Sequence, residues 1–201
     1  MTIQRIAARI SRPFIRLVFR PDVRGAALVP SGGCVISANH LSGFDAFALL
    51  YTVRSRSVRS MGKNDLFRRP LLGSLVRSLG AFPARDEGDL AGGVPVAASL
   101  AGSGEAVAIF PEGARRYGTV RRPRHGAART ALLAGVPLVP VAIAGTDGWR
   151  NRAQWHVAVG APVQLDDLRS DDGEASVREA TRRLWDAILT LEEELAVGSF
   201  S

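Results

Sequence analysis

A histidine and an aspartate five residues apart form the first group in this sequence that could do acid–base chemistry. His40 and Asp45 enclose the segment H-L-S-G-F-D, directly after the apolar run Cys34–Ala38. A carboxylate that reaches the second ring nitrogen of a histidine makes the imidazole a general base, and such a base turns an alcohol into a nucleophile. On one continuous helix, side chains five residues apart point about 140° away from each other. We therefore expect His40 in the turn before a helix and Asp45 in the first turn of that helix.

The residues between and before this pair favour the same placement. Asn39 and Ser42 are of types that cap helices, and Gly43 permits an unusual backbone conformation. A negative charge at Asp45 would be favoured by the helix dipole. The structural alternative is a hydrogen-bonded turn histidine beside an aspartate that only caps the helix.

A second charged group follows an apolar segment in the middle of the chain. Residues 105–110 (E-A-V-A-I-F) are typical of a buried strand, and residues 111–116 (P-E-G-A-R-R) end it with proline and glycine. Charged residues just past the carboxyl end of a core strand lie where open α/β sheets bind ligands. Glu112, Gly113 and Arg115 are therefore candidate binding residues, although an ordinary solvated loop has the same composition.

Four segments together carry a family resemblance. They are residues 39–45, 80–85, 110–115 and 136–141, and in this order they resemble the four motifs of the glycerolipid acyltransferases, the 1-acylglycerol-3-phosphate acyltransferase family. Residues 61–70 are similar to the segment that joins the first two motifs. The resemblance extends from about Val23 to Leu165. The sequence departs from the family pattern at Pro83, Ala114 and Arg116.

The resemblance implies transfer of a fatty acyl group from a thioester, acyl-CoA or acyl-ACP, to the free hydroxyl of a lysophospholipid in phospholipid biosynthesis. The resemblance implies 1-acylglycerol-3-phosphate as the acceptor, and its acylation would give phosphatidic acid. His40 would take the hydroxyl proton and Asp45 would hold the imidazole, with no metal, cofactor or protein nucleophile. The alternatives are another lyso-lipid acceptor (a lysophospholipid, an aminolipid or a glycolipid) and a non-catalytic lipid-binding homologue.

Substrate-binding residues also follow from the matched motifs. Arg85 and Arg115 correspond to phosphate-binding positions of the family, and the planar guanidinium suits a phosphate monoester. Glu112 and Gly113 correspond to positions that shape the acceptor pocket, and Lys63 is a basic neighbour. A serine hydrolase is a rival enzyme class, but the G-x-S-x-G elbow does not occur, and Ser42 is the serine nearest to the proposed base.

The first 22 residues form an amphipathic pattern. Arginines recur at three- and four-residue steps within a helical sector about 80° wide, and apolar residues occupy the neighbouring sector. The arginines are Arg5, Arg9, Arg12, Arg16 and Arg20, and the apolar residues are Ile3, Ile6, Ile10, Phe14 and Leu17. We interpret residues 1–22 as a membrane-interface helix and residues 23–201 as the acyltransferase domain. The alternative is a helix docked on the protein's own core with its arginines in solvent.

Composition limits the possible partners and locations. The net charge of +7 and the pI near 11.0 imply anionic partners such as phosphate esters or lipid head groups. Nucleic acid is not expected, because neither a zinc-ligand cluster nor an RNA-binding aromatic motif stands out. No apolar run approaches the 18 or so residues of a spanning helix. We therefore expect a peripheral or monotopic protein at the cytoplasmic face of the membrane, with no transmembrane span.

Alternating strand and helix patterns predict the fold. Strands are expected at 34–38, 58–61, 81–84, 106–110, 138–142 and 155–159, and helices at 44–53, from 65, at 94–100, at 127–134 and near the C-terminus. With 201 residues the chain is long enough for one domain. The prediction is a single α/β domain with a mixed, mostly parallel sheet flanked by helices, preceded by the N-terminal amphipathic helix.

Overall fold

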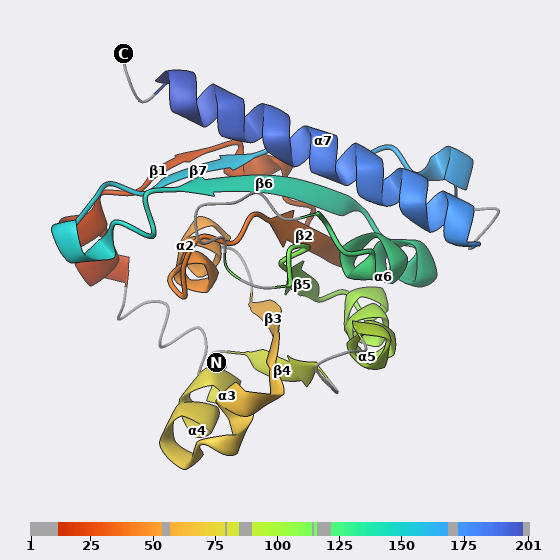
Figure 1. Ribbon diagram of the computed structural model, residues 1–201, viewed down its shortest axis with the longest axis horizontal. Helices are drawn as coiled ribbons and strands as arrows, with labels where there is room; N and C mark the ends of the chain where they lie inside the picture. Colours follow the sequence, from red (N-terminus) through yellow and green to blue (C-terminus); the bar gives the residue numbers. More distant parts are fainter. Residues whose placement is uncertain are drawn as a thin grey trace.

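The structure is a computed structural model that describes residues 12–53, 57–78, 80–84, 90–113, 115, 122–168 and 173–198 (Figure 1). Its framework is a seven-stranded sheet. The strands are β1 (Asp22–Arg24), β2 (Cys34–Ala38), β3 (Val58–Lys63), β4 (Ala81–Ala84), β5 (Ala106–Ile109), β6 (Leu138–Ala144) and β7 (His156–Val159). Six of these were expected within a few residues, and β1 was not.

The strands follow the order β1-β7-β6-β2-β5-β3-β4 across the sheet. Every neighbouring pair is parallel except β6 and β7, which are antiparallel. Because β1 is parallel to β7, these two strands run against the other five. The predicted mixed, mostly parallel α/β sheet in a single domain is confirmed.

Helices cover both faces of the sheet. They are α2 (Asp45–Thr52), α3 (Asn64–Arg68), α4 (Pro70–Ser78), α5 (Leu90–Gly102), α6 (Gly126–Ala134) and α7 (Glu174–Gly198), and residues 12–19 are also helical. Short 3-10 turns occupy Ala26–Leu28, Trp149–Asn151 and Asp166–Leu168. In Figure 1, α7 and α2 lie on opposite sides of β6, and α3 and α4 lie beside β4 at the other end of the sheet.

The core has two layers because successive strand residues point to opposite faces of the sheet. Cys34, Ile36 and Ala38 of β2 pack with α2 and helix 12–19, whereas Val35 packs with α5, α6 and α7. All five residues of β2 are buried. A continuous apolar run is what a central parallel strand requires when helices cover both its faces. Strand β2 is therefore fully enclosed by the core.

Helix 12–19 docks on the core through a face that the sequence pattern did not single out. Ile15 and Phe19 are buried, and the Phe19 ring stacks on Trp155 at 4.3 Å. The predicted apolar face is turned outward instead, with Phe14 62% and Leu17 81% exposed. The other predicted apolar residues (Ile3, Ile6 and Ile10) and two of the arginines (Arg5 and Arg9) lie outside the described residues.

One arginine of the predicted polar stripe contacts the protein itself. The Nη2 of Arg12 donates to the carbonyl oxygens of Leu50 and Val53, at 3.4 and 3.5 Å. A cation there complements the carboxyl end of the α2 dipole. Within the described part of the chain, no helix has both the length and the apolar character needed to cross a membrane.

Candidate active site

Three adjacent parallel strands bring the proposed catalytic residues to one edge of the sheet. Strand β2 lies between β6 and β5, with Ala38 opposite Val141 and Ser37 opposite Ile109. Because these strands are parallel, their carboxyl ends meet at the same edge, where α/β sheets bind ligands. His40 follows β2 and Glu112 follows β5. The sheet topology therefore unites two motifs that are 72 residues apart.

His40 and Asp45 form the predicted pair. His40 lies in the turn before α2, and Asp45 is the first residue of that helix. The Nδ1 of His40 lies 2.7 Å from Oδ2 of Asp45. Asp45 is fully buried, whereas the His40 side chain keeps 20% of its surface exposed. An ionised carboxylate is an acceptor only, so Nδ1 carries the proton and Nε2 is the nitrogen that can accept one.

The Asp45 carboxylate is surrounded by hydrogen-bond donors. Oδ2 also accepts from the backbone N–H groups of Leu41 (2.7 Å) and Ser42 (2.9 Å), and Oδ1 accepts from the hydroxyl of Thr146 at 2.5 Å. A buried charge is tolerated when it is paired and hydrogen-bonded in this way. The turn from residue 40 to 45 is therefore folded around the carboxylate.

The His40 ring and backbone have their own supports. The ring stacks on Phe110 with centroids 4.3 Å apart and planes 19° apart. The backbone N–H of His40 donates to Oε1 of Glu112 at 3.1 Å, and Glu112 is only 1% exposed. Glu112, expected to shape the acceptor pocket, thus contacts the candidate catalytic turn, residues 40–45, directly. Among the described residues, none hydrogen-bonds Nε2 of His40.

One expectation about the turn itself was wrong. Asn39 does not cap α2: its side-chain amide donates to the carbonyl of Ile143 at 2.8 Å and accepts from the Ile143 N–H at 2.7 Å. The amide thereby replaces a backbone pairing where β2 has ended beside β6. Gly43 has no left-handed backbone, since its φ is not positive. Ser42 stabilises the turn before α2, because its Oγ accepts from the N–H of Phe44 at 3.0 Å.

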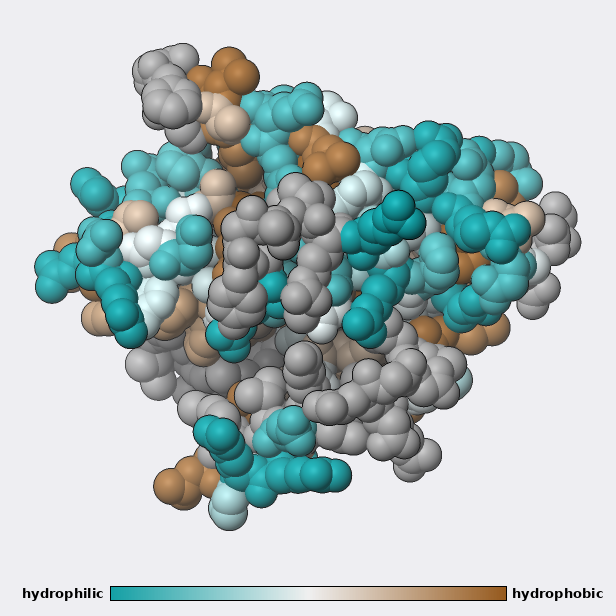
Figure 2. All heavy atoms as spheres, viewed as in Figure 1, coloured by the Kyte–Doolittle hydropathy of each residue, from teal (hydrophilic) through white to brown (hydrophobic). Residues whose placement is uncertain are grey.

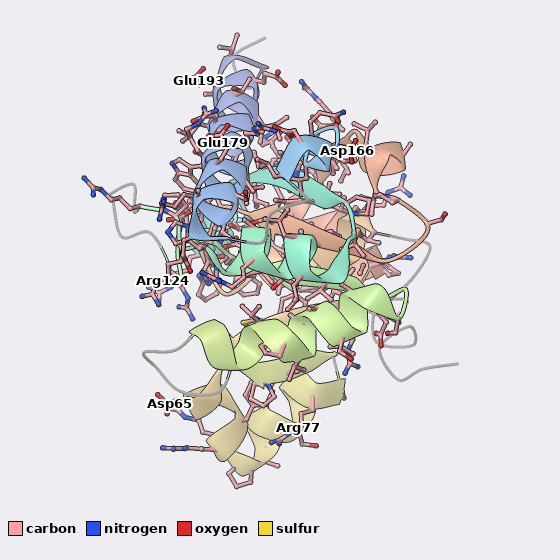
Figure 3. All side chains as sticks on the ribbon, turned by 90° about the vertical axis from the view of Figure 1, so that its right-hand side faces the viewer. Asp65, Arg77, Arg124, Asp166, Glu179 and Glu193 are labelled. Carbon is pink, nitrogen blue, oxygen red and sulfur yellow. The ribbon has the colours of Figure 1, made fainter. Side chains whose placement is uncertain are left out.

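Arg115 approaches the catalytic turn from the loop after β5. Its Nη2 lies 3.7 Å from the position that a Cβ at Gly43 would occupy. Gly113 has a φ of +66°, and a Cβ there would lie 2.7 Å from Nε of Arg124. The space beside Gly113 is therefore occupied by the guanidinium of Arg124. Arg124 is exposed and projects from its loop in Figure 3.

Two further predicted binding residues follow the next strands of the same edge. Lys63 ends β3, which is parallel to β5 and places its carboxyl end beside that of β5. Arg85 directly follows β4 but lies outside the described residues, as do Ala114 and Arg116. Thr146 was missed by sequence reasoning, because it lies outside the four motifs, beyond the end of β6. Across the described segments, no group of three or more His, Cys, Asp or Glu side chains could hold a metal ion.

This arrangement defines a class: an α/β protein with a histidine–carboxylate pair and an arginine at the carboxyl edge of its sheet. A sequence model of the acyltransferase family matches residues 20–144. The chain belongs to the acyltransferase family, and is an enzyme of that family by sequence and fold.

Individual relatives agree with this assignment. The chain is 27% identical to a 1-acyl-sn-glycerol-3-phosphate acyltransferase of Bacillus subtilis, over 84% of this chain and 85% of the relative. It is also 27% identical to the enzyme of the same name from Haemophilus influenzae, over 80% and 70% of the two chains. The crystal structure of the acyltransferase PlsC from Thermotoga maritima matches 96% of this chain with a TM-score of 0.72 at 22% identity. That likeness shows the fold.

Proposed function

We propose that this protein transfers a fatty acyl group from an acyl thioester to the free hydroxyl of 1-acylglycerol-3-phosphate, giving phosphatidic acid. The observation that carries the proposal is the 2.7 Å contact between His40 Nδ1 and Asp45 Oδ2, which leaves Nε2 as the ring nitrogen that can accept a proton. The names of the Bacillus subtilis and Haemophilus influenzae relatives support the choice of acceptor.

The reaction needs one base and no covalent intermediate on the protein. Nε2 of His40 takes the proton as the acceptor oxygen bonds to the thioester carbonyl carbon. Asp45 stabilises the imidazolium that forms. The C–S bond then breaks, and the leaving thiolate takes the proton back from His40. A thioester is activated enough that orienting the alcohol and removing its proton account for most of the catalysis.

Arg115 is proposed to bind the phosphate of the acceptor. Its guanidinium lies beside Gly43, between His40 and Asp45 in sequence, so a phosphate on Arg115 places the neighbouring glycerol hydroxyl near the imidazole. Arginine binds a phosphate monoester through two parallel hydrogen bonds. Lys63, the last residue of β3, and Arg85, which follows β4 in sequence, are proposed as further cationic groups that bind the phosphate.

The enzyme is proposed to work as a peripheral protein on a membrane surface, because both of its lipids reside there. The exposed Phe14 and Leu17 would enter the membrane interface while Ile15 and Phe19 hold their helix to the core. Replacing Phe14 and Leu17 together with serine should reduce co-sedimentation with anionic vesicles. Undiminished co-sedimentation of the double variant would contradict this placement.

A purified-protein assay tests the acceptor and the donor together. Lysophosphatidic acid, other lysophospholipids, a lyso-aminolipid and a lyso-glycolipid are each offered with acyl-CoA and with acyl-ACP, and product lipids are identified by mass spectrometry. We expect phosphatidic acid from lysophosphatidic acid as the fastest reaction. Faster acylation of an acceptor without a phosphate monoester would replace the proposed substrate.

The Arg115→Glu variant sharpens the same assay. Reversing the charge should raise the KM for lysophosphatidic acid at least about tenfold, because each charge-assisted contact with the phosphate is lost and replaced by repulsion. Arg150→Glu, an exposed arginine in the Trp149–Asn151 turn, is the matched control. An unchanged KM in Arg115→Glu would remove the phosphate-binding role.

A further inference from the structure

Thr146 contacts the carboxylate of Asp45 although the two residues are distant in sequence. It follows β6, is fully buried, and is 101 residues away from Asp45. Its hydroxyl donates to Oδ1 of Asp45, whereas the Nδ1 of His40 uses the other oxygen, Oδ2. Thr146 therefore holds the carboxylate oxygen that the imidazole does not use.

We propose that Thr146 is a positioning residue that fixes the plane of the Asp45 carboxylate and thereby the orientation of the His40 base. The inference rests on the proposed function, in which His40 removes the proton of the acceptor. A carboxylate turns easily about its Cβ–Cγ bond, since torsions of this kind have broad minima. Donors on both oxygens remove that freedom. A hydrogen bond to an ionised group in a buried setting is also among the stronger ones in proteins.

The chain around Thr146 is built to hold the hydroxyl in place. Gly145 has a φ of +82°, and a Cβ there would lie only 2.1 Å from the carbonyl oxygen of Gln154. A glycine is therefore required at the turn that delivers Thr146. Two residues before Gly145, Ile143 is bound in both directions by the side-chain amide of Asn39. The carboxyl end of β6 is thus fixed to the catalytic turn at two separate points.

Thr146 has an effect on the base that a simple packing residue would lack. Without the hydroxyl, Oδ1 loses this donor at a fully buried carboxylate, and the carboxylate is restrained against rotation only through the donors on Oδ2. Rotation moves Oδ2 away from Nδ1 of His40. The expected consequence is a loss of kcat, because the base is misoriented, with little change in KM, because the substrate contacts of Arg115 are untouched.

The experiment compares three variants at residue 146 with a matched control. Thr146→Val and Thr146→Ala remove the hydroxyl, and Thr146→Ser keeps it. The control is Thr130→Val, because Thr130 is equally buried but donates to the carbonyl of Gly126 within α6. If Thr146→Val fails to fold, the Ala and Ser variants provide the same comparison, since both lack the methyl group and differ only by the hydroxyl.

Two measurements are made on each variant. Proton NMR of the free enzyme follows the far-downfield resonance of the His40 Nδ1 proton, assigned by its loss in His40→Ala. Steady-state kinetics gives kcat and KM. We expect Thr146→Val to shift or abolish the resonance and to lower kcat roughly tenfold to a hundredfold, with KM within about twofold. Thr146→Ser and Thr130→Val should keep both the resonance and kcat near those of the unmodified protein.

A resonance and a kcat unchanged in both Thr146→Val and Thr146→Ala would overturn the positioning role while leaving the proposed function in place. Equal losses in Thr146→Ser and Thr146→Ala would also overturn it, because the hydroxyl would then be irrelevant. If the unmodified enzyme acylates none of the acceptors, the proposed function fails, and the resonance still decides whether Thr146 holds the His40–Asp45 pair.

Discussion

The carboxylates of Asp45 and of Glu179 on α7 are both hydrogen-bonded, but they differ in burial and in the groups that donate to them. Asp45 is fully buried and accepts hydrogen bonds from a ring nitrogen, two backbone N–H groups and a hydroxyl. Glu179 keeps 34% of its side chain exposed and accepts from the guanidinium groups of Arg182 and Arg183. The first group combines the turn before α2, the first residue of that helix and the segment after β6, whereas the second lies along one helix.

Ion pairs continue from Glu179 to the neighbouring 3-10 turn. Both η nitrogens of Arg183 donate to the carboxylate of Asp167, and α7 runs past the turn that holds Asp166 in Figure 3. Arg182, and then Arg183, lower the pKa of Glu179 to about 2. The hydrogen bond from Arg183 likewise lowers the pKa of Asp167. The surface over α7 in Figure 2 is mostly hydrophilic, as expected for charges in water.

In this fold the candidate site is marked by burial of a carboxylate rather than by a shifted pKa. A strongly shifted pKa is often used to find active sites. Here the carboxyl with a pKa near 2 belongs to a solvated network on α7, where ion pairs contribute little to stability. The catalytic turn is recognised instead by a fully buried carboxylate at the carboxyl ends of adjacent parallel strands. If this distinction is correct, substitutions around Asp45 must change activity, and those in the α7 network must leave it nearly unchanged.

Two single variants, one at His40 and one at Arg183, are expected to show the largest difference in kcat/KM. His40→Ala should lower kcat/KM about 100- to 10,000-fold, because the general base is lost, while the partly exposed ring contributes little to the core. Arg183→Met should leave kcat/KM within about twofold. Both are measured by acyl transfer to lysophosphatidic acid, with circular dichroism as the check on folding. Retained turnover in His40→Ala, or a large loss in Arg183→Met, would break the contrast between the regions.

Asp45→Asn tests whether the buried carboxylate serves both chemistry and folding. Asparagine carries no charge to stabilise an imidazolium, and its NH2 group must face either the backbone N–H groups of the Oδ2 position or the hydroxyl of Thr146. We expect about a 100-fold loss of kcat and about 2–4 kcal/mol lower free energy of unfolding. Asp147→Asn is the control, because Asp147 is exposed and its Oδ1 accepts from the N–H of Gly148 at 3.2 Å. Urea unfolding that gives equal stability for the two variants would contradict the assignment.

Asn39→Ala probes the contact between the catalytic turn and β6. Its removal leaves the buried N–H and carbonyl of Ile143 without their side-chain partners, so the free energy of unfolding should fall by about 2–3 kcal/mol. Ser103→Ala is the matched control, because the exposed hydroxyl of Ser103 also donates to a carbonyl, that of Leu100. This control should change stability by less than about 0.5 kcal/mol. Comparable urea midpoints for the two variants would show that the Asn39 amide does not brace the site.

Sequence reasoning succeeded where the signal is local. The apolar run of β2 with Asn39 to Asp45 after it placed His40 in a turn and Asp45 at a helix start, and the structure confirms both. It did not anticipate β1, because Asp22–Arg24 has neither length nor apolar alternation and is a strand only by pairing with β7.

The contacts of Asn39, Glu112 and Thr146 could not be predicted, because each depends on strand order. Nothing in the sequence states that β6 and β5 flank β2, yet that order brings Thr146 to Asp45 and Glu112 to the His40 backbone. Asn39 illustrates the resulting error: its type favours a helix cap, but the neighbouring strand offers Ile143 as a better partner. Residue types indicated the chemistry of the candidate site, whereas the order of the strands determined which residues hydrogen-bond to it.

The smallest expected effect belongs to the α7 network and depends on pH. The pKa of Glu179 in the folded protein, about 2, lies below its ordinary value of 4.5, so its pairing with Arg182 and Arg183 stabilises the fold above about pH 4.5. That contribution is lost as the pH falls toward 2. Arg183→Met should therefore lower Tm by about 1–3 °C at pH 7, and the difference should shrink steadily below about pH 4.5. A difference in Tm that stays constant on acidification would show that Arg183 acts through packing of its aliphatic stem rather than through its carboxylate partners.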